Sequence, residues 1–333
     1  MIAAQRVLER FAEPFNLAGT DVVVSPSIGL AVFPDHSERP DELLKCADLA
    51  MYAAKSSGRN TIRIYESEQS SVAIERAETE ILLRRAIERE QFEVYYQIAV
   101  DMKTGQPLGV EALLRWRHPQ QGLIGPDAFI AIMEDNGMIV TVGRWVLNEA
   151  LAQLKAWDMG GLPNLYVSVN LSILQLNRGN LVSELTALLE LYELAGQRLT
   201  LELTESLVMA NPEQSIATLK LISELGVQIA IDDFGTGYSS LAYLKRLPID
   251  KLKIDKTFVR DLGEDSDDTA ITHSIIALGQ TLGLTIIAEG VETQAQQSLL
   301  LSLGCAQAQG YLYARPMSAS ECTVLLRERM LRF

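Results

Sequence analysis

The sequence AIDDFGTGYSS, at residues 230–240, is the stretch from which the fold is most readily inferred. The segment before its two acids, 227–231, is mostly apolar and follows Gly226, which predicts a buried strand. Two adjacent carboxylates at the end of a buried strand are unusual, because unpaired buried charge is costly. Followed by Gly-Thr-Gly, they indicate a cation site beside a mobile loop, although Asp and Gly would also suit a solvated turn. The ends of the other strands decide between these alternatives.

Strand-like and helix-like segments alternate on both sides of this stretch. The strand-like segments are 92–100, 108–116, 165–171, 199–203, 228–232, 251–254, 284–288 and 306–311. Helical patterns lie between them at 145–157, 180–194, 212–225, 269–282 and 293–303. This alternation implies parallel pairing and predicts an α/β fold, a closed (β/α)8 TIM-like barrel. A doubly wound sheet is the alternative, but no glycine-rich dinucleotide motif follows the first strand.

Acidic or amide residues end most of the predicted strands. They are Glu111, Asn170, Glu202, Asp232, Asp233 and Glu289. Because the carboxyl ends of barrel strands meet at one mouth, these side chains should face one another. Carboxylates repel at short range, so the cluster requires cations, and ligands that are all oxygen favour Mg²⁺ or Mn²⁺. Any one of these acids would fit a hydrated loop, but the repeated pattern favours a metal centre.

Motifs around these acids resemble the EAL domain, the phosphodiesterase family that hydrolyses cyclic di-GMP. The matching segments are 96–97, 111–113, 115–116, 168–172, 202–205, 232–240, 253–255, 288–292 and 309–311. The resemblance extends over residues 73–333 and implies metal-dependent hydrolysis of one phosphodiester bond to give linear pGpG. After Gln97 the family usually has proline, which fixes the backbone, whereas this chain has Ile98.

The resemblance also implies a role for each residue of the site. One metal would be held by Glu111, Asn170, Glu202 and Asp232, and a second by Asp232, Asp233 and Glu289. The catalytic set would comprise Lys253, Glu111, Asp232, Asp233, Glu205 and Glu292. In it, Lys253 would hold the water activated by the metals, and Glu205 and Glu292 would orient the ligands and the loop. The substrate would contact Gln97, Leu113, Arg115 and Gln309.

Residues 1–66 are predicted to form an incomplete domain. Its expected elements are a strand over 22–33, a helix with Asp41 as N-cap and a strand over 61–65, and these are too few to bury a normal core. Segments 27–29, 47–55 and 58–60 resemble the C-terminal part of an α+β GGDEF (diguanylate cyclase) domain. The name-giving loop and the upstream metal-binding acid are absent, so we expect no cyclase activity. A connecting helix over 67–90, either a signal relay or a plain linker, would overlap the start of an EAL barrel at 91–333.

Composition limits the partners and the compartment. The net charge of −14 argues against nucleic acid and against membrane contact by this chain. Its three cysteines show no CxxC spacing, which favours a reducing, cytoplasmic location, with any membrane anchor placed upstream in a longer protein. That longer protein would also supply a missing sensory or GGDEF region. The resemblance further implies a homodimer through the EAL domain, with the loop at 232–240 near the contact.

Two other functions fit parts of the sequence. A receptor would bind cyclic di-GMP without hydrolysing it, but this usually accompanies the loss of a metal-binding acid, and none is lost here. A barrel lyase would use Lys253 to form a Schiff base, which requires the lysine to lie in apolar surroundings that this sequence does not provide. The leading hypothesis is therefore a metal-dependent cyclic di-GMP phosphodiesterase.

Overall fold

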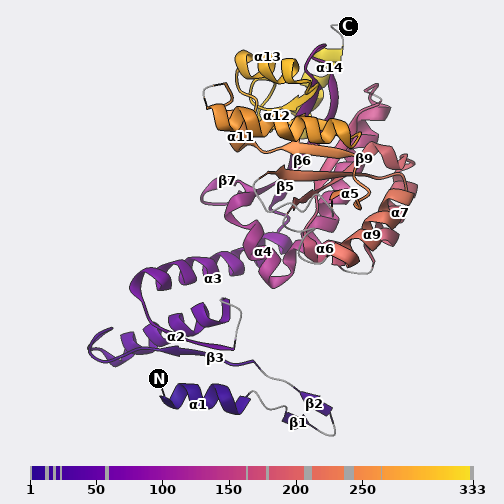
Figure 1. Ribbon diagram of the computed structural model, residues 1–333. Helices are drawn as coiled ribbons and strands as arrows, with labels where there is room; N and C mark the ends of the chain where they lie inside the picture. The colour runs from indigo at the N-terminus through magenta and orange to yellow at the C-terminus, as the bar shows by residue number, and fades with distance from the viewer. Residues whose placement is uncertain are drawn as a thin grey trace. The chain divides into compact units, whose positions relative to one another are not determined.

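The chain divides into two units, Met1–Arg85 and Ala86–Phe333, which are described separately (Figure 1). The computed structural model describes residues 2–11, 15–17, 20–22, 25–56, 60–162, 164–177, 180–205, 212–235, 244–263 and 265–330. Within these ranges, no helix combines the length and the apolar character needed to span a bilayer.

The first unit contains two small sheets and three helices among its described residues. Its elements are α1 (Ile2–Phe11), β1 (Phe15–Leu17), β2 (Thr20–Val22), β3 (Ser27–Leu30), α2 (Pro40–Ser56), β4 (Thr61–Ile64) and most of α3 (Ser67–Glu88), whose last residues belong to the second unit. Strands β3 and β4 are parallel, and α2 connects them and packs on β3. A Cβ at Gly29 would lie 2.1 Å from the Ala47 carbonyl oxygen, so only glycine permits this close packing. Helix α2 begins at Pro40, which suits a first helical turn, so Asp41 lies inside the helix and is not its N-cap.

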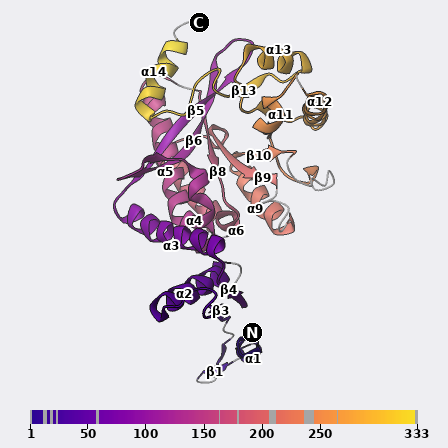
Figure 2. The ribbon, with the colours of Figure 1, turned by 90° about the vertical axis from the view of Figure 1, so that its left-hand side faces the viewer.

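The second unit is built on a ring of eight strands among the described residues (Figure 2). They are β5 (Phe92–Asp101), β6 (Pro107–His118), β8 (Tyr166–Asn170), β9 (Leu199–Thr204), β10 (Gln228–Phe234), β11 (Lys251–Ile254), β12 (Thr285–Ala288) and β13 (Gln307–Gln309). The order is β5-β13-β12-β11-β10-β9-β8-β6, and pairing of β6 with β5 closes the ring. A short strand, β7 (Gly122–Ile124), extends β6 on its other edge. The predicted α/β barrel is confirmed.

One strand runs against the predicted direction. Strand β5 is antiparallel to both of its neighbours, β6 and β13. The reason is the short connection from β5 to β6, in which the Asp101 carboxylate accepts hydrogen bonds from the backbone N–H groups of Lys103 and Thr104 at 3.0 and 2.8 Å. A turn this short can join only antiparallel strands, because a parallel pair needs a long crossover. The expectation of uniformly parallel pairing was therefore wrong for β5.

Helices cover the outside of the ring and bury its apolar face. They are α4 (Ile130–Asn136), α5 (Met138–Met159), α6 (Ile173–Asn177), α7 (Leu181–Tyr192), α9 (Pro212–Glu224), α11 (Lys256–Arg260), α12 (Ser266–Thr281), α13 (Gln294–Leu303) and α14 (Ala319–Met330), with short 3-10 turns at Pro126–Ala128 and Gly196–Arg198. Outward-facing strand residues such as Val167, Leu201 and Ile231 are at most 1% exposed. Since side chains alternate along a strand, the residues between them point into the barrel, where the polar site is built.

Candidate metal centre and active site

The strand register brings the predicted polar residues to one end of the barrel. Glu111 on β6 lies opposite Ser168, and Asn170 on β8 lies opposite Glu202 on β9. On the next strand, Asp232 lies opposite Thr204. These neighbours place the side chains in adjacent layers at the carboxyl ends of the parallel strands. The structure thus brings together residues separated by more than a hundred positions in the sequence.

Lys253 lies at the centre of this cluster and is 1% exposed. Its Nζ is 2.5 Å from Glu289 Oε1, 2.7 Å from Glu202 Oε2, 3.2 Å from Asp232 Oδ2 and 3.5 Å from Glu111 Oε2. Four acids from four strand ends therefore share one buried ammonium. Although burial alone would lower the pKa of Lys253, these carboxylates raise it well above its ordinary value.

Amide side chains hold Glu111 from the other side. Gln309 Nε2 donates to Glu111 Oε2 at 2.7 Å and to Gln97 Oε1 at 2.9 Å, and Asn170 Nδ2 donates to Glu111 Oε1 at 2.8 Å. Gln97 Nε2 in turn donates to the Ala314 carbonyl oxygen at 2.9 Å. Both ends of the Gln97 amide are thus fixed, although Ile98 replaces the usual proline and lies fully buried. Gln97 is placed by its side-chain partners as well as by its backbone.

The acids of the cluster differ in how readily they ionise. Burial would raise the pKa of Glu111, but the Lys253 charge and the amide donors outweigh burial, so its pKa is lowered. Burial raises the pKa of Glu202 to about 8, and repulsion from Glu111 and Asp232 adds to this despite the attraction of Lys253. Burial and the same kind of repulsion raise the pKa of Glu289 well above its ordinary value. The single ammonium of Lys253 therefore neutralises only part of the negative charge of these acids.

Asp233 sits beside this cluster in an uncommon backbone conformation, with φ of 52°. Its N–H donates to Asp232 Oδ1 at 3.0 Å, and its side chain shares a hydrogen bond with Asp255. Burial, the charge of Asp232 and this hydrogen bond raise the pKa of Asp233 to about 6. Asp255 also caps α11 by accepting from Thr257 N at 2.9 Å. No role in the site was predicted for Asp255, although an acid directly after the strand at 251–254 is a signal for one.

A divalent metal fits the residues present. Oxygen atoms of Asp232, Asp233 and Glu289 all lie within 4.8 Å of one another, and the donors are carboxylates, the ligand type that Mg²⁺ and Mn²⁺ prefer. The raised pKa values of Glu202 and Glu289 reflect crowded negative charge that a cation would relieve.

The remaining predicted residues lie at different distances from this centre. Glu205 is buried, its Oε2 accepts from Gly235 N at 3.3 Å, and its Oε1 has no partner among the described residues. The Glu292 side chain is exposed at the rim of the mouth. Arg115 shares a strand face with Glu111 and is half-buried; its Nη1 donates to the Leu114 carbonyl oxygen at 2.9 Å. The loop predicted near a dimer contact lies, from residue 236 onward, outside the described residues.

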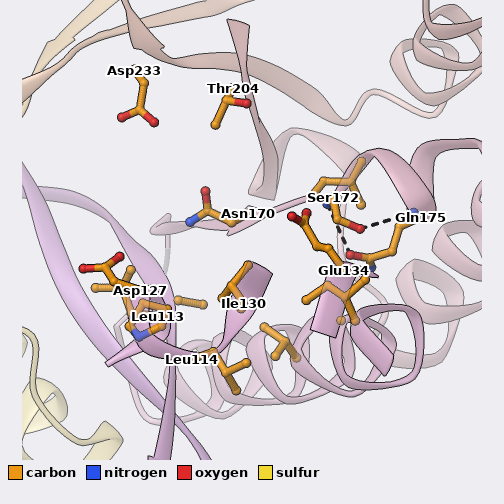
Figure 3. A pocket seen from close by; sticks show the side chains of 16 residues that line it. Leu113, Leu114, Asp127, Ile130, Glu134, Asn170, Ser172, Gln175, Thr204 and Asp233 are labelled. Carbon is orange, nitrogen blue, oxygen red and sulfur yellow. Dashed lines mark hydrogen bonds between the residues drawn. The ribbon is translucent and has the colours of Figure 1, made fainter. Parts of the chain in front are cut away.

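Two cavities open beside the metal centre, and Leu113 lines both. One, of 600 Å³, is bounded by Glu111, Asp232, Glu289, Glu292, Gln97 and Gln309, together with residues of α11 and the segment after β13. The other, of 440 Å³, lies between β6, α4, α5 and β8. Figure 3 shows Thr204 and Asp233 along one side of this second cavity, with Glu134, Ser172 and Gln175 grouped apart from them. The sequence indicated neither the second cavity nor its polar group.

Comparison with known proteins defines the class. The chain belongs to the EAL-domain family, whose model matches residues 82–316, and a diguanylate cyclase GGDEF domain model matches residues 1–61. Both resemblances inferred from sequence are confirmed.

Two relatives from Pseudomonas aeruginosa are similar over nearly the whole chain. The bifunctional diguanylate cyclase/cyclic di-GMP phosphodiesterase MucR is 46% identical over 318 residues, which cover 96% of this chain and 46% of the relative. The cyclic di-GMP phosphodiesterase NbdA is 41% identical over 326 residues, covering 98% of this chain and 42% of the relative. The chain thus spans less than half the length of these relatives.

Solved structures are similar to the barrel. A PaMucR phosphodiesterase in complex with cyclic di-GMP matches with a TM-score of 0.70 and 50% identity, covering 72% of this chain and 97% of the solved one. The EAL enzyme Bd1971, bound to cAMP and cyclic di-GMP, matches with a TM-score of 0.74 and 35% identity, covering 77% of this chain and 70% of the solved one.

Proposed function

We propose that this chain is a metal-dependent phosphodiesterase that hydrolyses one phosphodiester bond of cyclic di-GMP and releases linear pGpG. The observation that carries the proposal is the convergence of Glu111, Glu202, Asp232 and Glu289 on one buried point. Such an acidic cluster suits a site that binds cations and, through them, an anionic phosphodiester. The names of the relatives and of the solved complexes support cyclic di-GMP as the substrate.

The proposed metals are two Mg²⁺ or Mn²⁺ ions held by the strand-end residues. Glu111, Asn170, Glu202 and Asp232 would hold one, and Asp232, Asp233 and Glu289 the other. When bound, the ions would supply a Lewis acid for the phosphate oxygens and lower the pKa of a water molecule. Asp233, fixed by its left-handed backbone and by Asp255, presents its carboxylate toward Asp232 and Glu289.

Other side chains position the reactants. Lys253 holds the attacking water and offsets charge that develops on the phosphate, because its protonated ammonium is fixed among the acids. Gln309, itself bonded to Gln97, orients Glu111. Arg115 and Leu113 contact the substrate from the same face of β6. Glu205 supports the loop that begins at Gly235, and Glu292 orients groups at the rim.

The wider assembly follows from the same proposal. The barrel at 91–333 carries the activity, the segment at 67–90 connects it to the GGDEF-like fragment, and the fragment at 1–66 has no cyclase activity. The barrel forms a homodimer near the loop at 232–240. A longer protein in the cytoplasm supplies the sensory or GGDEF region upstream.

Turnover of cyclic di-GMP tests the proposal. Purified chain and the Glu111→Ala variant are incubated with cyclic di-GMP in Mg²⁺, in Mn²⁺ and in EDTA, and the products are separated by chromatography. We expect pGpG from the wild type with either metal, none in EDTA, and at least a roughly hundredfold lower rate for the variant. Tight binding of cyclic di-GMP by the wild type without metal-dependent product would make the chain a receptor and overturn the proposal.

A further inference from the structure

The 600 Å³ cavity at the barrel mouth is rich in negative charge and contains two cationic residues in its described lining. Its acids are Glu111, Asp232, Glu289 and Glu292, and its cations are Lys256 and Arg260 on α11. A cyclic dinucleotide carries two phosphates, only one of which can be hydrolysed at the metal centre at a time. The second phosphate would enter this acidic cavity with its charge uncompensated unless a cation receives it.

The central lysine of the barrel, Lys253, cannot bind the second phosphate. Lys253 is 1% exposed, is absent from the described lining of this cavity, and already pairs with four carboxylates. Arg115, proposed above to contact the substrate from β6, is absent from the described lining of this cavity. Among the described residues that line this cavity, Lys256 and Arg260 therefore remain as the cations.

The backbone around Lys256 is held close to the metal centre. Gly290, directly after Glu289, has φ of +66°, and a Cβ added there would lie 2.6 Å from Lys256 Cβ. Only glycine lets the segment after β12 approach α11 this closely. The Lys256 side chain therefore begins next to the residue that follows a proposed metal ligand.

Helix α11 is fixed at both ends, so its side chains start from a rigid support. At its start, Asp255 accepts from Thr257 N at 2.9 Å. At its end, Gln296 Nε2 donates to the carbonyl oxygens of Val259 and Arg260 at 3.0 and 2.9 Å. Arg260 pairs with Asp261 at 3.0 Å and is 74% exposed at its side chain, so part of its charge is already compensated. Lys256 is the better placed of the two cations.

We propose that Lys256, assisted by Arg260, binds the second, non-scissile phosphate of the cyclic dinucleotide and thereby positions the substrate. This inference rests on the proposed function and adds a residue that discriminates a cyclic dinucleotide from a simple phosphodiester. Because the second phosphate does not react, its contact is equally strong in the ground state and the transition state. Loss of the contact therefore raises KM and leaves kcat nearly unchanged.

Kinetics with two substrates test this assignment. Lys256→Met, Lys256→Arg and Arg260→Met are compared with wild type on cyclic di-GMP and on bis(p-nitrophenyl) phosphate, which has one phosphate. Lys220→Met, on the exposed face of α9, is the matched control. For Lys256→Met we expect KM for cyclic di-GMP to rise about tenfold with kcat within about twofold, and no change with the smaller substrate. Arg260→Met should have a smaller effect, and Lys256→Arg should recover most of the affinity.

Two results would overturn the assignment: equal losses on both substrates, or a fall in kcat without a change in KM.

Equilibrium binding of cyclic di-GMP to Glu111→Gln, with and without Lys256→Met, separates this inference from the proposed function. If the wild type binds but does not hydrolyse cyclic di-GMP, the proposed activity fails, and about tenfold weaker binding on adding Lys256→Met would still support the phosphate contact. Unchanged binding would refute it, and a wild type that neither binds nor hydrolyses would refute both. Matching unfolding midpoints show that the variants are folded.

Discussion

Replacement of the central lysine, Lys253→Met, should destabilise the metal-free protein much more than the metal-bound one. The substitution keeps most of the side-chain volume but removes the ammonium that lies 2.5 to 3.5 Å from four carboxylates. Without a metal, those acids would then share a buried site with no positive charge. With Mg²⁺ bound, the ions supply that charge, so the same substitution costs less.

The magnitude follows from the distances. At an effective dielectric constant of about 20, each of these pairs contributes roughly 5–7 kcal/mol before desolvation, which offsets most of the gain. Removing one partner of a buried ion pair typically costs about 3–5 kcal/mol. Because burial already raises the pKa of Glu202 to about 8, and raises that of Glu289 as well, protonation of these acids limits the loss at pH 7. We therefore expect a loss of about 3 kcal/mol in the free energy of unfolding in EDTA.

Urea denaturation at pH 7, in EDTA and in saturating Mg²⁺, measures this difference. The three tryptophans, Trp116, Trp145 and Trp157, all lie in the barrel unit, so their fluorescence reports on its unfolding. Lys251→Met is the matched control, because Lys251 is buried on the same strand but forms no ion pair among the described residues. Equal destabilisation of Lys253→Met in EDTA and in Mg²⁺, or none in EDTA, would refute the reasoning.

Three further predictions concern single contacts. Burial lowers the pKa of Lys251 to about 8, which disfavours folding below pH 8, so Lys251→Met should stabilise the chain by at most about 3 kcal/mol at pH 7. As pH rises from about 8 toward 10.5, Lys251 loses its proton more readily in the folded chain than in the unfolded chain, so the free energy of unfolding of the wild type should increase. Urea titrations of the variant should lack that increase. Thr293→Ala removes the hydroxyl that accepts from Gln296 N at 3.2 Å in the capping box of α13, and thermal unfolding should show a loss of about 1 kcal/mol. Gly290→Ala should lower the free energy of unfolding by roughly 1–3 kcal/mol, because φ is +66° there and Lys256 blocks a Cβ. Its KM for cyclic di-GMP should also rise. An unchanged KM and melting temperature would contradict the packing.

The strand ends were predictable because their chemistry is local. A buried strand fixes which side chains share a face, and the barrel topology brings the carboxyl ends together, so Glu202, Asp232 and Glu289 could be grouped from the sequence. The direction of β5 was also signalled, by its short connection to β6, but the regular alternation along the rest of the chain favoured a uniformly parallel barrel.

Contacts that depend on tertiary register could not be predicted. The side chains of Asp233 and Asp255 share a hydrogen bond where the register between β10 and β11 shifts, and no local pattern encodes that register. The approach of Gly290 to Lys256 likewise depends on how the segment after β12 packs against α11. Tertiary packing decides such contacts between residues far apart in the sequence.

The number of bound Mn²⁺ ions tests the proposed two-metal centre most directly. Wild type and Asp233→Asn are dialysed against Mn²⁺ in the presence of a phosphorothioate analogue of cyclic di-GMP, and the bound ions are counted by elemental analysis. We expect two ions per wild-type chain and one per variant chain, because Asp233 is proposed to hold only the second metal. A wild-type chain that binds one ion or none under these conditions would contradict the two-metal centre.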